Sequence, residues 1–128
     1  MAINPKTEGL HHVALRSTDF EKTKNFYQGT LGFQLALDTP EIIGFVAGSL
    51  ILAFKKAQAR AGETFTPFNI GLDHLALACD SEEELQRVAA ALSEAGVENT
   101  GVKLDETLQK NYVAFKDPDR IQWEFYMK

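Results

Sequence analysis

The sequence repeats after 62 residues, and this repeat restricts the possible folds more than any other feature. The stretch GLHHVALRSTD, which starts at residue 9, aligns with GLDHLALACDS, which starts at residue 71. His12 then coincides with His74, whereas His11 coincides with Asp73. A repeat of this length indicates one supersecondary unit used twice. Only the second histidine of the HH pair therefore has a counterpart in the other copy.

Each copy predicts a strand, a helix and three further strands. Alternating apolar residues open each copy, and a capping-box pattern, Ser or Thr followed by Glu three residues later, opens each helix. The box runs from Thr18 to Glu21 in the first copy and from Ser81 to Glu84 in the second. The predicted strands cover residues 11–16, 34–38, 42–47 and 49–54 in the first copy, and 74–79, 102–105, 111–116 and 121–126 in the second.

The two βαβββ units together predict a single α+β domain over residues 1–128. Module 1 covers about residues 9–56 and module 2 about residues 71–128. A connection without periodicity, about residues 57–70, lies between them and is expected at the surface. With 128 residues, of which 45% are hydrophobic, the chain is long enough to bury a core without disulfides.

Composition and charge restrict the partners. The net charge of −5 is spread over segments of mixed sign, which argues against nucleic acid and anionic membranes as partners. No apolar run approaches the ~20 residues that span a bilayer. The single cysteine, Cys79, cannot form an intramolecular disulfide and is expected in the core. Because the N-terminal MAINPKTEGL lacks the apolar centre of a signal peptide, we expect a cytoplasmic protein.

Side-chain alternation places the two repeated histidines on sheet faces that small residues line. On the first strand, His12 shares its face with Ala14 and Arg16, and His11 points to the opposite face. In module 2, His74 likewise shares its face with two alanines. Small neighbours leave space beside each histidine, so we expect a cavity there rather than a packed layer.

The last predicted strand, IQWEFY, adds a carboxylate to such a face. Trp123 and Phe125 are natural core residues, so the alternation places Glu124 with Gln122 and Tyr126 on the other face. A buried ionised carboxylate needs a charged partner or a metal. Two histidines and one carboxylate form the 2-His-1-carboxylate set, which binds Fe(II), Mn(II), Ni(II), Co(II) or Zn(II) and leaves positions open for substrate.

Three stretches resemble the vicinal oxygen chelate (VOC) superfamily, which includes glyoxalase I, extradiol dioxygenases, methylmalonyl-CoA epimerase and the fosfomycin and bleomycin resistance proteins. They are HHVALRSTDFEKTKNFYQGTLGF, LDHLALACDSEEEL and YVAFKDPDRIQWEF. The resemblance implies two tandem βαβββ modules that form an open, cup-shaped mixed sheet with helices on the outside. It also implies one divalent metal ion in the cup, bound by His12, His74 and Glu124.

The family's fourth possible ligand lies on the last strand of the first module, where we expect Leu52 opposite Glu124. Leucine cannot bind a metal, which favours the three-ligand members, the extradiol dioxygenases and fosfomycin-modifying enzymes, over glyoxalase I and the epimerase. Members of this size often pair the first module of one chain with the second module of another. The resemblance thus implies a homodimer in which His12 and Glu124 of one site come from different chains.

The remaining candidate residues are polar groups on the same faces. Arg16 is expected to hold a substrate anion, and Gln122 and Tyr126 to line the substrate pocket. Either Tyr112 or a metal-bound water is expected to act as the catalytic base. The implied function is a metal-dependent enzyme that chelates a small oxygen-rich substrate: a lyase or isomerase, a dioxygenase or a transferase. One alternative is a metal-free drug- or metabolite-binding protein that resembles the bleomycin resistance proteins, and another is a metal-dependent regulatory or scaffold domain.

Overall fold

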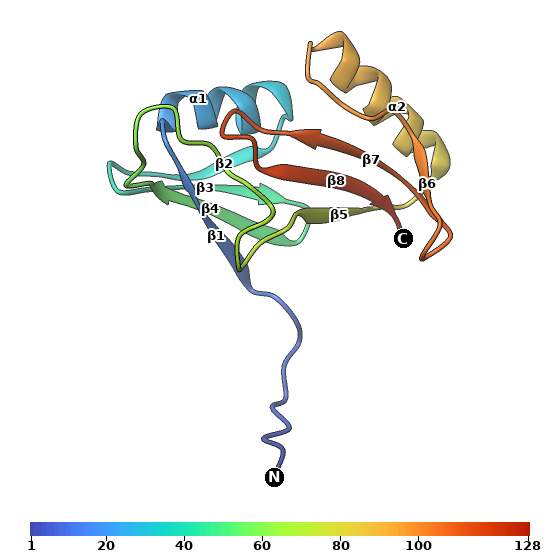
Figure 1. Cartoon of the computed structure of the whole chain (residues 1–128), viewed down its shortest axis with the longest axis horizontal. Coiled ribbons are helices and arrows are strands. Elements are labelled where there is room, and N and C mark those ends of the chain that lie inside the picture. Colours follow the sequence, from blue (N-terminus) through green and yellow to red (C-terminus); the bar gives the residue numbers. More distant parts are fainter. The chain divides into compact units, whose positions relative to one another are not determined.

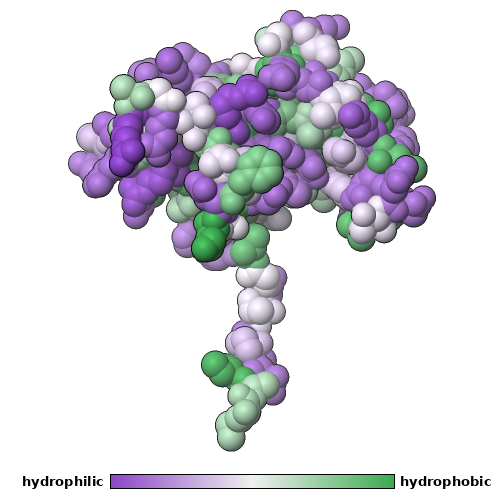
Figure 2. All heavy atoms as spheres, in the orientation of Figure 1, coloured by the Kyte–Doolittle hydropathy of each residue, from purple (hydrophilic) through white to green (hydrophobic).

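The computed structural model describes all 128 residues, and the chain divides into two compact units, Met1–Ala59 and Arg60–Lys128. Each unit contains one copy of the repeat, here called the first and the second module (Figure 1). The segment before the first strand is exposed along its whole length and stands clear of the first module in Figure 2. No helix is both long and apolar enough to cross a membrane.

The first module forms a four-stranded mixed sheet in the order β1-β4-β3-β2. Strand β1 pairs with β4 in parallel, and the other two pairs are antiparallel. The elements in chain order are β1 (His12–Ser17), α1 (Phe20–Lys24), the π-helix η1 (Asn25–Thr30), β2 (Gln34–Asp38), β3 (Ile42–Ala47) and β4 (Leu50–Lys56).

The second module repeats this topology in its own sheet, in the order β5-β8-β7-β6. The first and last strands again pair in parallel, and the other pairs are antiparallel. Its elements are β5 (Leu75–Cys79), α2 (Glu82–Glu94), β6 (Lys103–Asp105), β7 (Lys110–Lys116) and β8 (Gln122–Met127). The predicted α+β class and the duplicated βαβββ unit are confirmed. Every predicted strand is present, and its ends lie within two residues of the prediction.

The first helix differs from its prediction at its N-terminus, and it changes its geometry after the first turn. Asp19, not Thr18, is the N-cap, because its side chain accepts hydrogen bonds from the backbone N–H groups of Glu21 and Lys22. After one turn the helix widens, and the N–H of Leu31 donates to the carbonyl of Phe26, five residues earlier, at 2.8 Å. In α2 the predicted cap is confirmed, since the N–H of Glu84 donates to Ser81 Oγ at 3.1 Å.

Each module has its own core between the sheet and the helix. In the first module an aromatic cluster dominates, in which the buried ring of Tyr27 contacts Phe45 and Phe54. In the second module Leu85 of α2 and Val113 of the sheet are fully buried, and Trp123 of the sheet is almost fully buried. The remaining buried apolar side chains of the chain are Phe20, Phe26, Ile43, Ala47, Leu52, Ala53, Cys79, Ala89, Leu92, Ala114, Phe115 and Ile121.

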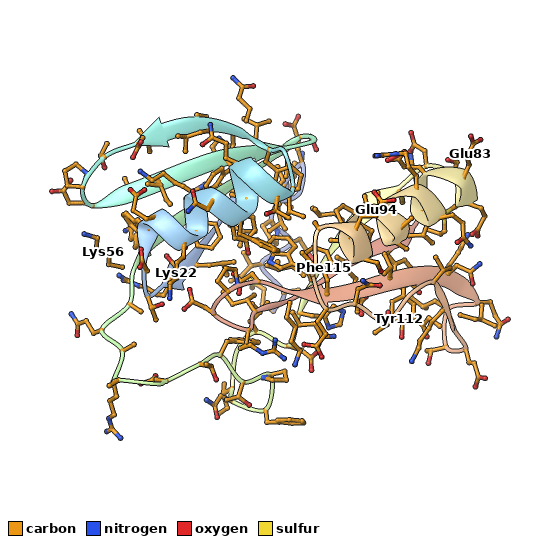
Figure 3. The ribbon with its side chains drawn as sticks, turned by 90° about the horizontal axis from the view of Figure 1, so that it is seen from above. Lys22, Lys56, Glu83, Glu94, Tyr112 and Phe115 are labelled. Atoms are coloured by element: carbon orange, nitrogen blue, oxygen red, sulfur yellow. The ribbon has the colours of Figure 1, made fainter.

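The face of the second sheet that points away from α2, here called the helix-free face, carries most of the candidate residues. Figure 3 shows Phe115 of β7 on the side toward α2 and Tyr112 on the other side. Strand pairing aligns Tyr112 with Tyr126, and Ala114 with Glu124, along this face. The second sheet therefore separates a hydrophobic layer under α2 from a polar layer that holds a glutamate.

Candidate metal centre

His74 lies immediately before β5, between two carboxylates of the same module. Its Nδ1 atom is 2.6 Å from Oδ1 of Asp73, a hydrogen-bond distance. Its Nε2 atom is 3.4 Å from Oε1 of Glu124. The imidazole is thus fixed on one side by an exposed carboxylate and presents its other nitrogen to a buried one.

Glu124 lies in the middle of β8, and only 12% of its side chain is exposed. Its neighbours on the two flanking strands are Ala76 and Ala114, which leave space around the carboxylate. Burial raises the pKa of Glu124, and the positive charge available on His74 opposes this rise. The negative charges of Asp105 and Asp73 raise the pKa further. A cation beside this carboxylate would offset its desolvation.

The His74 and Glu124 pair fits a divalent metal. Two ligand atoms bound to one tetrahedral ion at about 2.1 Å lie about 3.4 Å apart, which is the observed separation of Nε2 and Oε1. A hydrogen bond from His74 Nδ1–H to Asp73 leaves the Nε2 lone pair available for coordination. These two side chains are only part of a site, because no group of three His, Cys, Asp or Glu side chains is arranged to hold a metal ion.

The third predicted ligand, His12, opens β1 in the first module and is exposed. Its Nδ1 atom is 2.9 Å from Nδ1 of His11, and the two rings meet edge to face. The expectation that His11 points away from His12 is therefore wrong. The reason is that His11 precedes the first paired residue of β1, so the strand alternation does not constrain it. On the same strand, Arg16 donates from Nη1 to the carbonyl oxygen of Lys56 at 3.1 Å, which ties its guanidinium to the end of β4.

The expectation for the fourth ligand position is also wrong, by one residue. Leu52 pairs with Val13 and is fully buried, so it belongs to the layer under the helix. The residue that corresponds to Glu124 is Ala53, because Ala53 pairs with Ala14 as Glu124 pairs with Ala76. Alanine offers no ligand atom either, so the first module contributes no carboxylate at this position.

Two tyrosines lie next to Glu124 on the helix-free face. The rings of Tyr112 and Tyr126 stack with their centroids 6.0 Å apart and 16° between their planes. The hydroxyl of Tyr126 donates to Oδ2 of Asp105 at 2.7 Å. Burial, and then this hydrogen bond, raise the pKa of Tyr126 to about 12. Tyr126 therefore remains protonated at neutral pH.

Gln122 borders a small hollow on the second module. The hollow has a volume of about 160 Å³, and its polar lining includes Gln122, Lys116 and Thr100. Ala114, which lies beside Glu124 in the sheet, is also part of the wall. The second module thus places Gln122, Glu124 and Tyr126 in a row along β8, with a recess at the Gln122 end.

Two carboxylates that sequence reasoning did not single out contact the candidate residues. Asp73 binds the His74 ring, and Asp105 binds the Tyr126 hydroxyl. The position of Asp73 directly before a repeated histidine was a usable signal. Asp105 had no such signal, because its contact joins residues 21 apart in the chain, from strands that are not direct neighbours.

Comparison with known proteins identifies relatives along almost the whole chain. The family model of the Glyoxalase/Bleomycin resistance protein/Dioxygenase superfamily matches residues 9–125. The uncharacterized protein YwkD of Bacillus subtilis (strain 168) is 29% identical over 126 residues, which cover 93% of this chain and 96% of YwkD. The glyoxalase family protein from Enterococcus faecalis is 29% identical, with a TM-score of 0.78 and coverage of 93% of this chain and 97% of the other. A glyoxylase/bleomycin resistance protein/dioxygenase domain from Frankia sp. EAN1pec shares the fold at 22% identity, with a TM-score of 0.83 and coverage of 95% and 98%.

Proposed function

The chain belongs to the Glyoxalase/Bleomycin resistance protein/Dioxygenase superfamily, and from this premise we propose that it is a divalent-metal-dependent enzyme. The proposed ligands are His12, His74 and Glu124. The observation that carries the proposal is the placement of His74 Nε2 at 3.4 Å from the buried Glu124 carboxylate, with Asp73 on the far nitrogen. This is the arrangement that a metal-binding histidine needs.

The chemistry that a divalent ion supplies at such a site is Lewis-acid polarisation of two neighbouring oxygens of a small substrate. His74 and Glu124 would bind and orient this ion from the second module, and His12 from the first. Histidine nitrogen and carboxylate oxygen together suit iron, manganese, nickel, cobalt or zinc. The reaction class is that of a lyase or isomerase, a dioxygenase or a transferase.

The other candidate residues act on the substrate. In this proposal Gln122 offers an amide at the edge of the recess, and Tyr126 and Tyr112 present an aromatic surface beside Glu124. Because Tyr126 remains protonated and donates its hydroxyl hydrogen to Asp105, it lines the substrate site and does not act as a base. Tyr112 stays the candidate base. Arg16, tied to the end of β4, holds a remote anionic group of the substrate, which supplies binding energy away from the reacting atoms.

The test is the metal content of the purified protein, measured by elemental analysis for the wild type, His74→Ala and Glu124→Ala. We expect about one transition metal ion per chain in the wild type and its loss in both variants, since removal of one of three ligands leaves too few. Glu94→Ala is the matched control, because this residue lies on α2, outside the candidate site, and should keep the metal (Figure 3).

A wild-type protein without metal, even after incubation with each candidate ion, would contradict the proposal. The same holds if Glu124→Ala keeps as much metal as Glu94→Ala. In either case the chain would be better described as a metal-free protein that binds a drug or metabolite. The identity of a bound metal would in turn separate redox chemistry, for iron, from Lewis-acid chemistry, for nickel or zinc.

A further inference from the structure

Each of the two repeated histidines contacts the residue directly before it, and the repeat makes the two contacts equivalent. In the second module, Nδ1 of His74 is 2.6 Å from the carboxylate of Asp73, the residue directly before it. In the first module, Nδ1 of His12 is 2.9 Å from Nδ1 of His11, again the residue directly before it. His11 and Asp73 occupy equivalent positions in the two copies. The Nδ1 atom of the histidine is therefore contacted by the preceding side chain in both modules.

The contact with Asp73 determines where the proton of a neutral His74 ring lies. An ionised carboxylate can only accept hydrogen bonds, so the ring must carry its proton on Nδ1. The Nε2 atom, which faces Glu124 at 3.4 Å, then has a free lone pair. A ring with the proton on Nε2 would instead present a hydrogen atom to Glu124 and could not bind a metal through that nitrogen.

The contact between His11 and His12 does not by itself determine which ring donates the hydrogen bond. A neutral imidazole can donate or accept at Nδ1, so one ring of the pair carries the proton and the other accepts it. His12 has a free Nε2 lone pair only if its own Nδ1–H donates to His11. With His11 as the acceptor, the first module would use a neutral group where the second uses a charged one.

We propose that the residue before each ligand histidine is a positioning residue that fixes the tautomer of that imidazole: Asp73 for His74, and His11 for His12. This inference rests on the proposed metal site. It assigns to two exposed side chains a role in preparing both histidines before any ion arrives. Loss of an outer partner of this kind typically weakens metal binding about 10- to 100-fold.

The test reads the tautomers directly in the metal-free protein. Long-range ¹H–¹⁵N NMR spectra at about pH 8.5, above the usual pKa of an imidazole, distinguish Nδ1–H from Nε2–H rings. The chain contains only three histidines, so His74→Ala and His12→Ala variants assign all the signals. We expect the Nδ1–H form for His74 and His12 in the wild type. Asp73→Leu should move His74, and His11→Leu should move His12, toward the Nε2–H form.

Metal titration by calorimetry completes the experiment. Asp73→Leu should raise the dissociation constant about 10- to 100-fold, whereas Asp73→Asn, whose amide oxygen still accepts, should recover most of the affinity. Asp80→Leu, which removes the same charge just beyond β5, is the matched control and should match the wild type. Thermal melts check folding, which should be little affected because 73% of the Asp73 side chain is exposed.

The outcomes separate this inference from the proposed function. An Nε2–H ring for His74 in the wild type, or a tautomer unchanged in Asp73→Leu, would overturn the role of Asp73. The same results for His12 and His11→Leu would overturn the role of His11. If the tautomers shift as expected but the wild type binds no metal, the positioning contacts stand and the proposed enzyme function fails.

Discussion

At the residue scale, the hydrogen bond between Tyr126 and Asp105 stabilises the ionised form of the acid and the protonated form of the phenol. The hydroxyl of Tyr126 donates to the carboxylate, which favours the ionised acid and the protonated phenol together. The bond lowers the pKa of Asp105 and contributes to the raised pKa of Tyr126. The negative charge of Asp105 thus remains at the end of β6, and only β7 separates this strand from β8, which carries the candidate metal ligand Glu124.

We predict that Tyr126→Phe raises the pKa of Asp105 toward the ordinary value for an aspartate. A carboxyl whose folded-state pKa is lowered stabilises the fold at pH values above its unfolded-state pKa, and this contribution is lost as the pH falls through the folded-state pKa. In the variant this contribution should therefore be smaller at neutral pH, and its loss on acidification should be complete at a higher pH. A ¹³C NMR titration of the aspartate carboxyl carbons measures the pKa, and acid unfolding measures the loss of stability.

Tyr112→Phe is the matched control for this experiment. It removes the hydroxyl of the stacked ring and leaves the hydrogen bond to Asp105 in place. An Asp105 pKa that is equal in Tyr126→Phe and in the wild type would show that the hydrogen bond does not hold the carboxylate in its charged form.

At the element scale, the register of β4 against β1 determines which side chains of the first module can reach a ligand. Pairing of Ala14 with Ala53 turns Leu52 into the core and leaves Ile51 on the face that His12 shares. Periodicity in the sequence predicted the strand and its alternation correctly, but not this register. The register of two parallel strands depends on contacts between distant segments, and a slip of one residue exchanges the two faces.

We predict that Leu52→Ala lowers the free energy of unfolding by about 2–5 kcal/mol, because it creates a cavity at a fully buried position. Ile51→Ala removes a side chain of the same size from the neighbouring position, which is 40% exposed, and should cost about 1 kcal/mol or less. Urea unfolding of both variants measures the difference. Equal losses would mean that the observed register of β4 is wrong.

The first helix shows a second limit of sequence reasoning at this scale. The capping pattern indicated Thr18, yet Asp19 caps the helix, since both residue types favour that position and only the backbone decides between them. The spacing of the apolar residues is compatible with the burial of Phe26 and Tyr27. It could not reveal the π-helix η1, because a single widened turn keeps these side chains on the buried face.

At the scale of the whole molecule, the topology was the feature that the sequence predicted best. Alignment of the chain with itself at a shift of 62 residues related the two modules. One βαβββ prediction therefore served for both copies. The same shift identified His12 and His74, and alternation in the last strand identified Glu124. The role of Asp105 could not be predicted, because contacts between non-adjacent strands leave no periodic signal in the sequence.

We predict that variants of the two modules complement each other if the site is shared between the chains of a homodimer, as the resemblance to the VOC superfamily implies. His12→Ala and Glu124→Ala homodimers would each lack an intact site. Refolded together in equal amounts, half of the dimers would be mixed, and each would regain one complete site, or about a quarter of the wild-type metal content. Elemental analysis of the mixture, with light scattering to establish the dimer, measures this.

The control for complementation is a mixture of His74→Ala with Glu124→Ala. Both changes lie in the second module, so no arrangement of the two chains restores a complete set of ligands. Metal recovered in this control, or none recovered in the first mixture, would contradict a site whose His12 and Glu124 come from different chains.

The alanine at position 53 has a consequence for the history of the chain. A tandem duplication produces two units that start out alike, and afterwards each copy mutates on its own. An alanine codon that ends in a purine becomes a glutamate codon by one base change at its middle position. If the codon of Ala53 is of this kind, the first module lies a single mutation from the carboxylate that the second module carries at the matching place, Glu124. Both copies have a histidine at or directly before the start of their first strand, and only the second copy has a glutamate on its last strand.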